Sequence, residues 1–110
     1  MKTDRLNSRY KDIIINILAA NPRVEQIVLF GSRAINTFTP TSDIDLALFG
    51  DELTLSDQAN LVDQIHHSVV PFEVDLLRYS SVSNRELLEH IIRDGVVWYS
   101  KIDSLHRTQQ

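Results

Sequence analysis

Residues 24–32 read Val-Glu-Gln-Ile-Val-Leu-Phe-Gly-Ser, and residues 42–49 read Ser-Asp-Ile-Asp-Leu-Ala-Leu-Phe. These two stretches decide the fold. Both are rich in the aliphatic, β-branched and aromatic side chains that favour strands. We therefore expect strands at Val24–Phe30 and Asp43–Phe49. Gly31-Ser32 ends the first strand, and Gly50-Asp51 ends the second.

One helix is predicted before these two strands in the sequence, and a second helix is predicted after them. Leu6–Ala20 has helical periodicity, and the Asn21-Pro22 pair ends it because proline disfavours the α conformation at the preceding residue. Ser56–Ser68 is predicted to be the second helix. The inward-facing residues are expected to be Leu6, Tyr10, Ile13, Ile14, Ile17 and Leu18 in the first helix, and Leu61, Val62 and Ile65 in the second.

The rest of the chain predicts a third strand, a third helix and a final short strand or docked tail. The strand is Phe72–Leu77, and Ser83-Asn84-Arg85-Glu86 has the spacing of a capping box that opens a helix. Gly95 is expected just beyond the end of that helix, followed by Val96–Tyr99. Alternation of helical and strand periods indicates an α/β or α+β domain.

Composition narrows the class of protein. A length of 110 residues predicts a single domain, residues 1–110, with a polar and frayed tail at 101–110. There are no cysteines, so disulfides are excluded. The net charge of −4 argues against direct binding to nucleic acid. No signal peptide or membrane-spanning run is present, which predicts a soluble, cytoplasmic protein with no membrane partner.

Asp43 and Asp45 form the first candidate site. Alternate residues of a strand face the same way, so the two carboxylates are expected roughly 6–7 Å apart on one face. Their repulsion, on the order of 2–3 kcal/mol at an effective dielectric near 20, favours a bridging cation. Mg²⁺ takes one or two protein carboxylates and completes its shell with water and phosphate. By itself, however, Asp-x-Asp is more often a solvated strand end.

Gly31-Ser32 is a candidate phosphate cradle. Glycine allows close approach of the backbone to a ligand, and a short helix at Ser32–Ile35 would direct free N–H groups at phosphate. The lysine of a P-loop is absent, and most Gly-Ser pairs are ordinary turns. Asn36–Ser42 is predicted to be a loop.

Asp75 is the third candidate acid. If its strand lies beside Asp43–Phe49, three carboxylates meet and could hold two metal ions for an in-line displacement. The alternative is the solvent face of an edge strand. Ten residues separate Ser32 from Asp43, which places the cradle and the acids in one pattern, Gly-Ser-x10-Asp-x-Asp.

The combined pattern resembles the minimal nucleotidyltransferases of the polymerase-beta-like superfamily over nearly the whole chain. The matching segments are Phe30–Ala34, Ser42–Ala47, Val74–Leu77 and Gly95–Tyr99. The resemblance implies a small mixed sheet flanked by helices, the nucleotidyltransferase fold. One departure is Ile35-Asn36, where many relatives have a glycine-containing pair, so the resemblance does not extend to the shape of this loop.

The resemblance also implies roles for individual residues. Asp43 and Asp45 would bind Mg²⁺, and Asp75 would complete the metal site and accept the proton of the nucleophile. Gly31 and Ser32 would hold the triphosphate of ATP, and Arg33 would neutralise its charge.

Larger relatives carry a second domain that binds the acceptor, and this chain is too short for one. Stand-alone members are similar to the antitoxin of HEPN–MNT toxin–antitoxin pairs. That similarity implies a HEPN ribonuclease toxin as partner and transfer of AMP from ATP to a toxin tyrosine. Two alternatives stay open: a binding module that neutralises its partner by covering it, and a small-molecule nucleotidyltransferase that acts as a homodimer.

The remaining notable side chains are predicted to have structural roles. His66-His67 is expected to cap a helix C-terminus, and His90 is expected on a solvent-facing helix position. Trp98 and Tyr99 are expected in the core or at a sheet edge, with a partner interface as the alternative. Phe38 and Pro40, in the loop before Asp43, are expected to have a packing role, with closure over a nucleotide as the alternative, and His106 lies in the tail.

Overall fold

The computed structural model describes residues 8–31, 34 and 43–101. In these residues four strands form one mixed sheet in the order β3-β2-β1-β4. β1 is antiparallel to both β2 and β4, whereas β2 and β3 are parallel. The prediction of a small mixed sheet is therefore confirmed. The strand bounds are Gln26–Phe30 (β1), Ile44–Phe49 (β2), Val74–Arg78 (β3) and Val96–Ser100 (β4).

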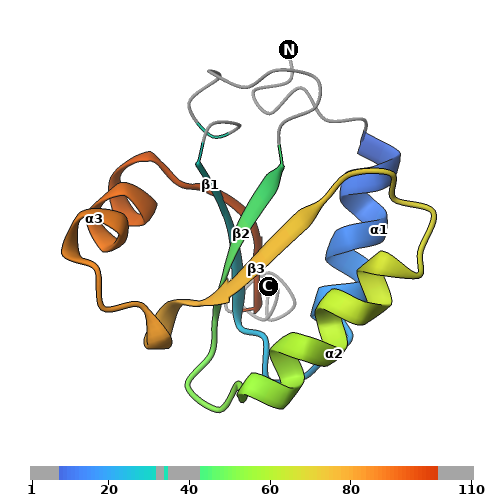
Figure 1. The fold of residues 1–110 in the computed structure, drawn as a ribbon, viewed down its shortest axis with the longest axis horizontal. Coiled ribbons are helices and arrows are strands. Elements are labelled where there is room, and N and C mark those ends of the chain that lie inside the picture. Colours follow the sequence, from blue (N-terminus) through green and yellow to red (C-terminus); the bar gives the residue numbers. More distant parts are fainter. Residues whose placement is uncertain (1–7, 32–33, 35–42, 102–110) are drawn as a thin grey trace, which may run out of the picture.

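Helices lie on both faces of this sheet (Figure 1). The helices α1 (Ser8–Ala19) and α2 (Leu55–His66) pack on one face, and α3 (Arg85–Asp94) lies on the other. A single 3-10 turn, η1 (Tyr79–Ser81), connects β3 to the segment that leads into α3. Among the described residues, no helix is long and apolar enough to cross a bilayer.

The sheet separates two apolar clusters, because alternate residues of each strand face opposite sides. The larger cluster lies under α1 and α2, and the smaller lies under α3. Trp98 belongs to the larger cluster and Tyr99 packs against it, which confirms their packing role. The sheet residues of the larger cluster are Ile27, Leu29, Ile44, Leu46, Leu48, Val74, Leu76 and Trp98, and the smaller cluster contains Val28, Phe30, Ala47 and Ile91.

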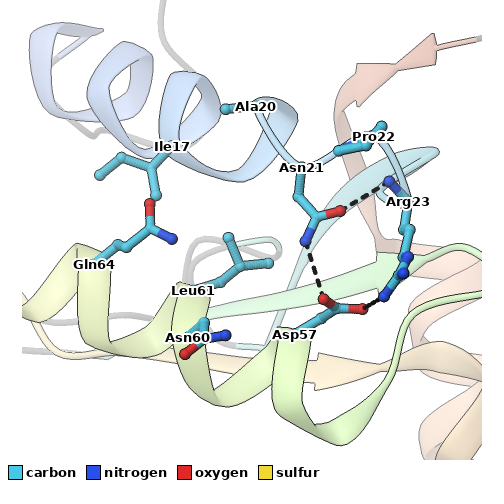
Figure 2. Close-up of a pocket in the computed structure, with 9 residues that line it drawn as sticks. All are labelled: Ile17, Ala20, Asn21, Pro22, Arg23, Asp57, Asn60, Leu61 and Gln64. Atoms are coloured by element: carbon cyan, nitrogen blue, oxygen red, sulfur yellow. Dashed lines mark hydrogen bonds and ion pairs between the residues drawn. The ribbon is translucent and has the colours of Figure 1, made fainter.

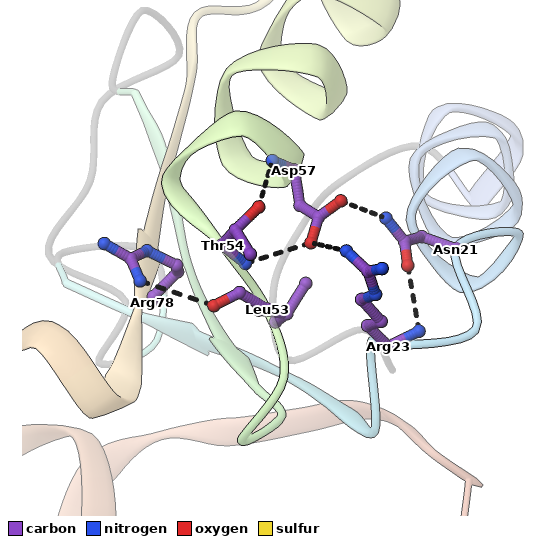
Figure 3. A network of polar contacts seen from close by, with 6 residues as sticks. All are labelled: Asn21, Arg23, Leu53, Thr54, Asp57 and Arg78. Carbon is purple, nitrogen blue, oxygen red and sulfur yellow. Dashed lines mark hydrogen bonds and ion pairs between the residues drawn. The ribbon is translucent and has the colours of Figure 1, made fainter.

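A capping box at Thr54 and Asp57 begins α2. The Thr54 hydroxyl accepts from the Asp57 backbone N–H at 3.0 Å, and the Asp57 carboxylate accepts from the Thr54 N–H at 2.9 Å. The Asp57 carboxylate also accepts hydrogen bonds from the Arg23 side chain at 3.0 Å and from the Asn21 side chain at 3.4 Å. These bonds connect the end of α1 to the start of α2 (Figure 3). The Thr54 N–H, Arg23 and the other donors lower the pKa of Asp57 to about 2.

Two local predictions about the helices are wrong. The N-cap of α3 is Asn84 rather than Ser83, so Glu86 does not occupy the third helical position that a capping box requires. Val62 is 38% exposed, because the inward stripe of α2 is carried by Leu61 and Ile65. Gly95 lies just beyond the end of α3, as predicted, and its backbone is extended.

A glycine is required at position 95 because the chain packs closely there. A Cβ atom at this position would collide with the Ile91 carbonyl oxygen and with Val28 of β1. The end of α3 can therefore approach the sheet only if residue 95 has no side chain. Gly95 also donates its N–H to the Ile91 carbonyl at 3.0 Å.

The chain is held just past β4 by Lys101, the first residue of the tail predicted to be frayed. Its backbone N–H donates to the Glu25 carbonyl at 2.8 Å, and its Nζ donates to the Pro22 carbonyl at 2.9 Å. Residues 102–110 lie outside the described residues. At the end of α2, His67 is the C-cap, and its ring Nδ1 lies 2.9 Å from the Asp63 carbonyl oxygen, consistent with the predicted capping role.

We expect Asn84→Ala to lower the free energy of unfolding by about 1 kcal/mol, because the Leu87 N–H loses its side-chain acceptor. Ser83→Ala should change it by less than about 0.5 kcal/mol, since Ser83 is exposed and lies outside the helix. Urea denaturation of both variants measures the difference. A larger loss for Ser83→Ala would place the cap at the position predicted from sequence.

Candidate functional site

Asp45 and Asp75 are brought side by side by the parallel pairing of β2 and β3. The two residues are register partners, and neighbouring strands lie about 4.8 Å apart. Both point to the α3 side of the sheet, since Ile44 and Leu46 on one strand and Val74 and Leu76 on the other belong to the opposite cluster. Asp43 is exposed immediately before β2. The condition that the sequence left open, adjacency of the two strands, is met.

Gly31 ends β1 next to the same carboxylates. Phe30 is the register partner of Asp45, so the following residue turns away at the sheet edge where β2 begins. Gly31 has φ 79°, a left-handed conformation that L side chains rarely adopt. A Cβ atom at this position would also collide with Asp45 Oδ2. Glycine therefore allows the turn and the carboxylate to touch.

The charge on Asp45 is unfavourable in this arrangement. Burial, followed by the negative charges of Asp75 and Asp43, raises its pKa to about 6. A hydrogen bond shared with Asp75 stabilises the protonated carboxyl further, and His90 acts weakly in the opposite direction. Asp45 is thus a half-buried carboxylate whose charged form is disfavoured on balance.

His90 reaches this site, so the prediction that it faces solvent is wrong. Its side chain is 22% exposed, and its Nε2 accepts a hydrogen bond from the Gly31 N–H at 2.9 Å. Its Nδ1 lies 3.1 Å from Asp94 Oδ2, one helical turn further on. The His-x-x-x-Asp spacing was the available signal, but a helix pair of this kind is common on solvent-facing surfaces.

The remaining predicted site residues are Ser32 and Arg33, which lie outside the described residues together with the loop at 35–42. Phe38 and Pro40 also lie outside the described residues. Of the short helix expected at Ser32–Ile35, the structure describes Ala34 alone. The roles predicted for Ser32 and Arg33 stay predictions.

The donor set at the sheet edge suits a hard divalent cation. Carboxylate oxygens are the ligands that Mg²⁺ prefers, and one or two of them suffice when phosphate and water complete the shell. The raised pKa of Asp45 marks the place where a cation would relieve repulsion. As arranged here, no group of three acidic, histidine or cysteine side chains in residues 8–31, 34 and 43–101 could hold a metal by itself.

A cavity of about 410 Å³ lies elsewhere, between α1 and α2 (Figure 2). It is next to the entrance of β1, whereas Gly31 and the acids are at the exit of that strand. The carboxylate that lines it, Asp57, is already bound by Thr54 and Arg23. This cavity therefore has no part in the acidic site. Its lining residues are Ile17, Ala20, Asn21, Pro22, Arg23, Asp57, Asn60, Leu61 and Gln64.

The family comparison covers most of the chain. Residues 12–104 match the family model described as polymerase beta, nucleotidyltransferase. This range includes β1 to β4, the Gly31 turn and all three acids. No curated protein matches the chain.

Solved structures with the same fold include toxin–antitoxin complexes. A chain in the crystal structure of a toxin–antitoxin with AMP-PNP is 25% identical, with a TM-score of 0.70, covering 90% of this chain and 86% of that one. A chain in the structure of the tri-AMPylated Shewanella oneidensis HEPN toxin in complex with MNT antitoxin is 22% identical. Its TM-score is 0.67, and the match covers 94% of this chain and 87% of that one.

Asp45→Asn should stabilise the metal-free protein at pH 7–8. The folded state raises the pKa of Asp45 from 3.8 to about 6, so the charged carboxylate costs stability fully above pH 6. The full shift corresponds to about 3 kcal/mol, which solvent screening of a half-exposed group reduces to about 1–2 kcal/mol. The gain should shrink as the pH falls through 6 and vanish below about 4.

Urea denaturation in EDTA across this pH range measures the effect. Asp51→Asn, an exposed acid at the opposite end of β2, is the matched control and should show no comparable pH dependence. An Asp45→Asn variant less stable than wild type at pH 7.5 would show that the charged carboxylate is well compensated.

Gly31→Ala should destabilise the fold by about 1–2 kcal/mol from its left-handed backbone alone, with a further cost from the collision with Asp45. In an Asp45→Ala background the collision disappears, so the second component should be lost. A double-mutant cycle in urea measures this coupling. Strict additivity would contradict the contact between Gly31 and Asp45.

Proposed function

Because the chain belongs to the polymerase-beta nucleotidyltransferase family, we propose that it transfers AMP from ATP to a hydroxyl group of a partner protein. Asp43, Asp45 and Asp75 are the proposed catalytic and metal-binding residues, and Gly31, Ser32 and Arg33 are the proposed nucleotide-binding residues. One observation carries this proposal: the register pairing of Asp45 with Asp75 beside the left-handed Gly31 turn.

The three acids have distinct places in the proposed reaction. Asp43 and Asp45, with Asp75, would hold Mg²⁺, which when bound supplies positive charge against the triphosphate. Asp45 is half-buried between the Gly31 turn and Asp75, so it would set the position of the bound positive charge. Asp75 is exposed on an edge strand and is accessible to an incoming acceptor.

Gly31 contributes shape rather than its own N–H to the phosphate cradle. That N–H is already donated to His90, so the hydrogen bonds to phosphate come from groups that follow it. The lack of a side chain at this position lets the triphosphate approach Asp45 closely. The turn and the acid therefore act on the same part of the nucleotide.

In the proposed step, the acceptor oxygen attacks the α-phosphorus of ATP. The new bond joins this oxygen to phosphorus, while the bond from the α-phosphorus to the oxygen bridging to the β-phosphate breaks and pyrophosphate leaves. The hydroxyl proton passes to the Asp75 carboxylate. Positioning and neutralisation of charge, rather than covalent catalysis, provide the rate enhancement.

The proposed acceptor is a tyrosine of a HEPN-type toxin, which would make this chain a cytoplasmic antitoxin in a hetero-oligomer. Support comes from the toxin–antitoxin structure with AMP-PNP and from the AMPylated HEPN toxin complex, both of which share this fold. An AMP group on a tyrosine adds negative charge and bulk, which would hinder RNA binding.

We expect α-labelled ATP with Mg²⁺ to label the product of the neighbouring gene, if it is a HEPN protein, when the two purified proteins are mixed. Asp43→Asn, Asp45→Asn and Asp75→Asn should each reduce the initial rate by roughly a hundred-fold or more, because each removes a charge on which the transfer depends. Asp51→Asn is the matched control, since this exposed acid lies beyond the other end of β2.

Inhibition of the toxin by this chain is a second measurement, which separates AMP transfer from simple binding. If the Asp→Asn variants still neutralise the toxin at a one-to-one ratio and the wild type transfers no label, the chain is a binding module. Label on a small molecule but not on the protein would favour the homodimeric small-molecule enzyme.

A further inference from the structure

His90 connects α3 to the turn that follows β1. The Gly31 backbone N–H can only donate, so His90 Nε2 is the acceptor and carries no proton. The other ring nitrogen, Nδ1, lies 3.1 Å from the Asp94 carboxylate and therefore carries the proton as donor. The network thus assigns a neutral imidazole in the Nδ1–H form, with its lone pair directed at Gly31.

The orientation of this ring is held from two sides. Asp94 Oδ2 accepts the ring Nδ1–H and also accepts Arg93 Nε and Nη2, at 3.2 and 2.9 Å. The ring also lies edge-on to Phe30, with 6.2 Å between centroids and an interplanar angle of 75°. Phe30 is the residue before Gly31 and the register partner of Asp45.

The turn held in this way is in contact with Asp45. A side chain on Gly31 would meet Asp45 Oδ2, so any shift of the turn changes the space between the backbone and the carboxylate. The hydrogen bond from Gly31 to His90 joins residues 59 positions apart, and it forms at this edge of the sheet. The distance between the turn and the acid therefore depends on α3.

We propose that His90 is a positioning residue for nucleotide binding, which holds the Gly31 turn at the separation from Asp45 that a metal-bound triphosphate requires. Asp94 acts through His90 by fixing its ring. The inference rests on the proposed function, because the ligand placed between the turn and the acids is the triphosphate.

A second histidine offers a matched comparison. His67 pairs with Asp63 one helical turn away, as His90 does with Asp94, but their side chains are 72% and 70% exposed. The ring of His67 bonds to its own helix rather than to the sheet. Loss of an ordinary helix pair is therefore separable from loss of the contact with Gly31.

The test measures the Kd of Mg²⁺ with AMP-PNP by titration calorimetry. His90→Leu removes the acceptor and should raise the Kd roughly ten-fold. His90→Gln places a carbonyl oxygen near the position of Nε2 and should bind within about three-fold of wild type. His67→Leu should leave the Kd unchanged. Asp94→Asn, which loosens the ring but leaves Nε2 in place, should give an intermediate Kd.

The amide resonance of Gly31 provides a readout that does not depend on nucleotide. In ¹⁵N-labelled protein it should move upfield in His90→Leu and return toward the wild-type position in His90→Gln. If His90→Leu fails to fold, Asp94→Asn and His90→Gln carry the test: equal affinities for wild type and Asp94→Asn would overturn the proposal.

Failure of this inference differs from failure of the proposed function. A wild-type chain that does not bind Mg²⁺ with AMP-PNP rejects the proposed function, and with it a role of His90 in nucleotide binding. A wild-type chain that binds, together with a folded His90→Leu variant of equal affinity, rejects the positioning role alone.

Discussion

The contact between Gly31 and the Asp45 carboxylate is the constraint on which the site depends. It exists because β1 and β2 are antiparallel neighbours in register, which puts the exit of one strand beside the entrance of the other. Any residue with a side chain at position 31 would separate the turn from the acid. Glycine is thus required at position 31 both by the left-handed φ of 79° and by the close approach to Asp45.

The unfavourable charge at Asp45 is tolerated because the opposite face of β2 is fully apolar. Ile44, Leu46 and Leu48 are completely buried under α1 and α2, so β2 keeps its place whatever its other face carries. The α3 side of the sheet has a smaller cluster and leaves one end to the acids. One face of β2 is therefore apolar and the other carries the acid, and the raised pKa of Asp45 reflects the cost of placing that charge there.

Much of this arrangement could be predicted from sequence, for identifiable reasons. The strand periodicity predicts that Asp43 and Asp45 share one face; Asp45 lies in β2 and Asp43 immediately before it. The fold confirms the mixed sheet that the family resemblance implies. The alignment of Asp75 with Asp45 could only be stated conditionally, because strand order is a long-range property. The sequence prediction that His90 faces solvent is wrong for the same reason. Its partner Gly31 is remote in sequence, whereas its local partner Asp94 gives the spacing of an ordinary surface pair on a helix.

The helix α3 contributes to both stability and the site through adjacent residues. Ile91 is its one fully buried residue, and the missing side chain at Gly95 lets the helix end approach Val28 of β1. These two contacts fix the helix on the sheet, and His90, next to Ile91, reaches Gly31 only because the helix is fixed there. A sequence change that loosened the seating of α3 would therefore reach Asp45 through the Gly31 turn without altering any acid. The local shape of the site is set by packing on α3 as well as by its own charges.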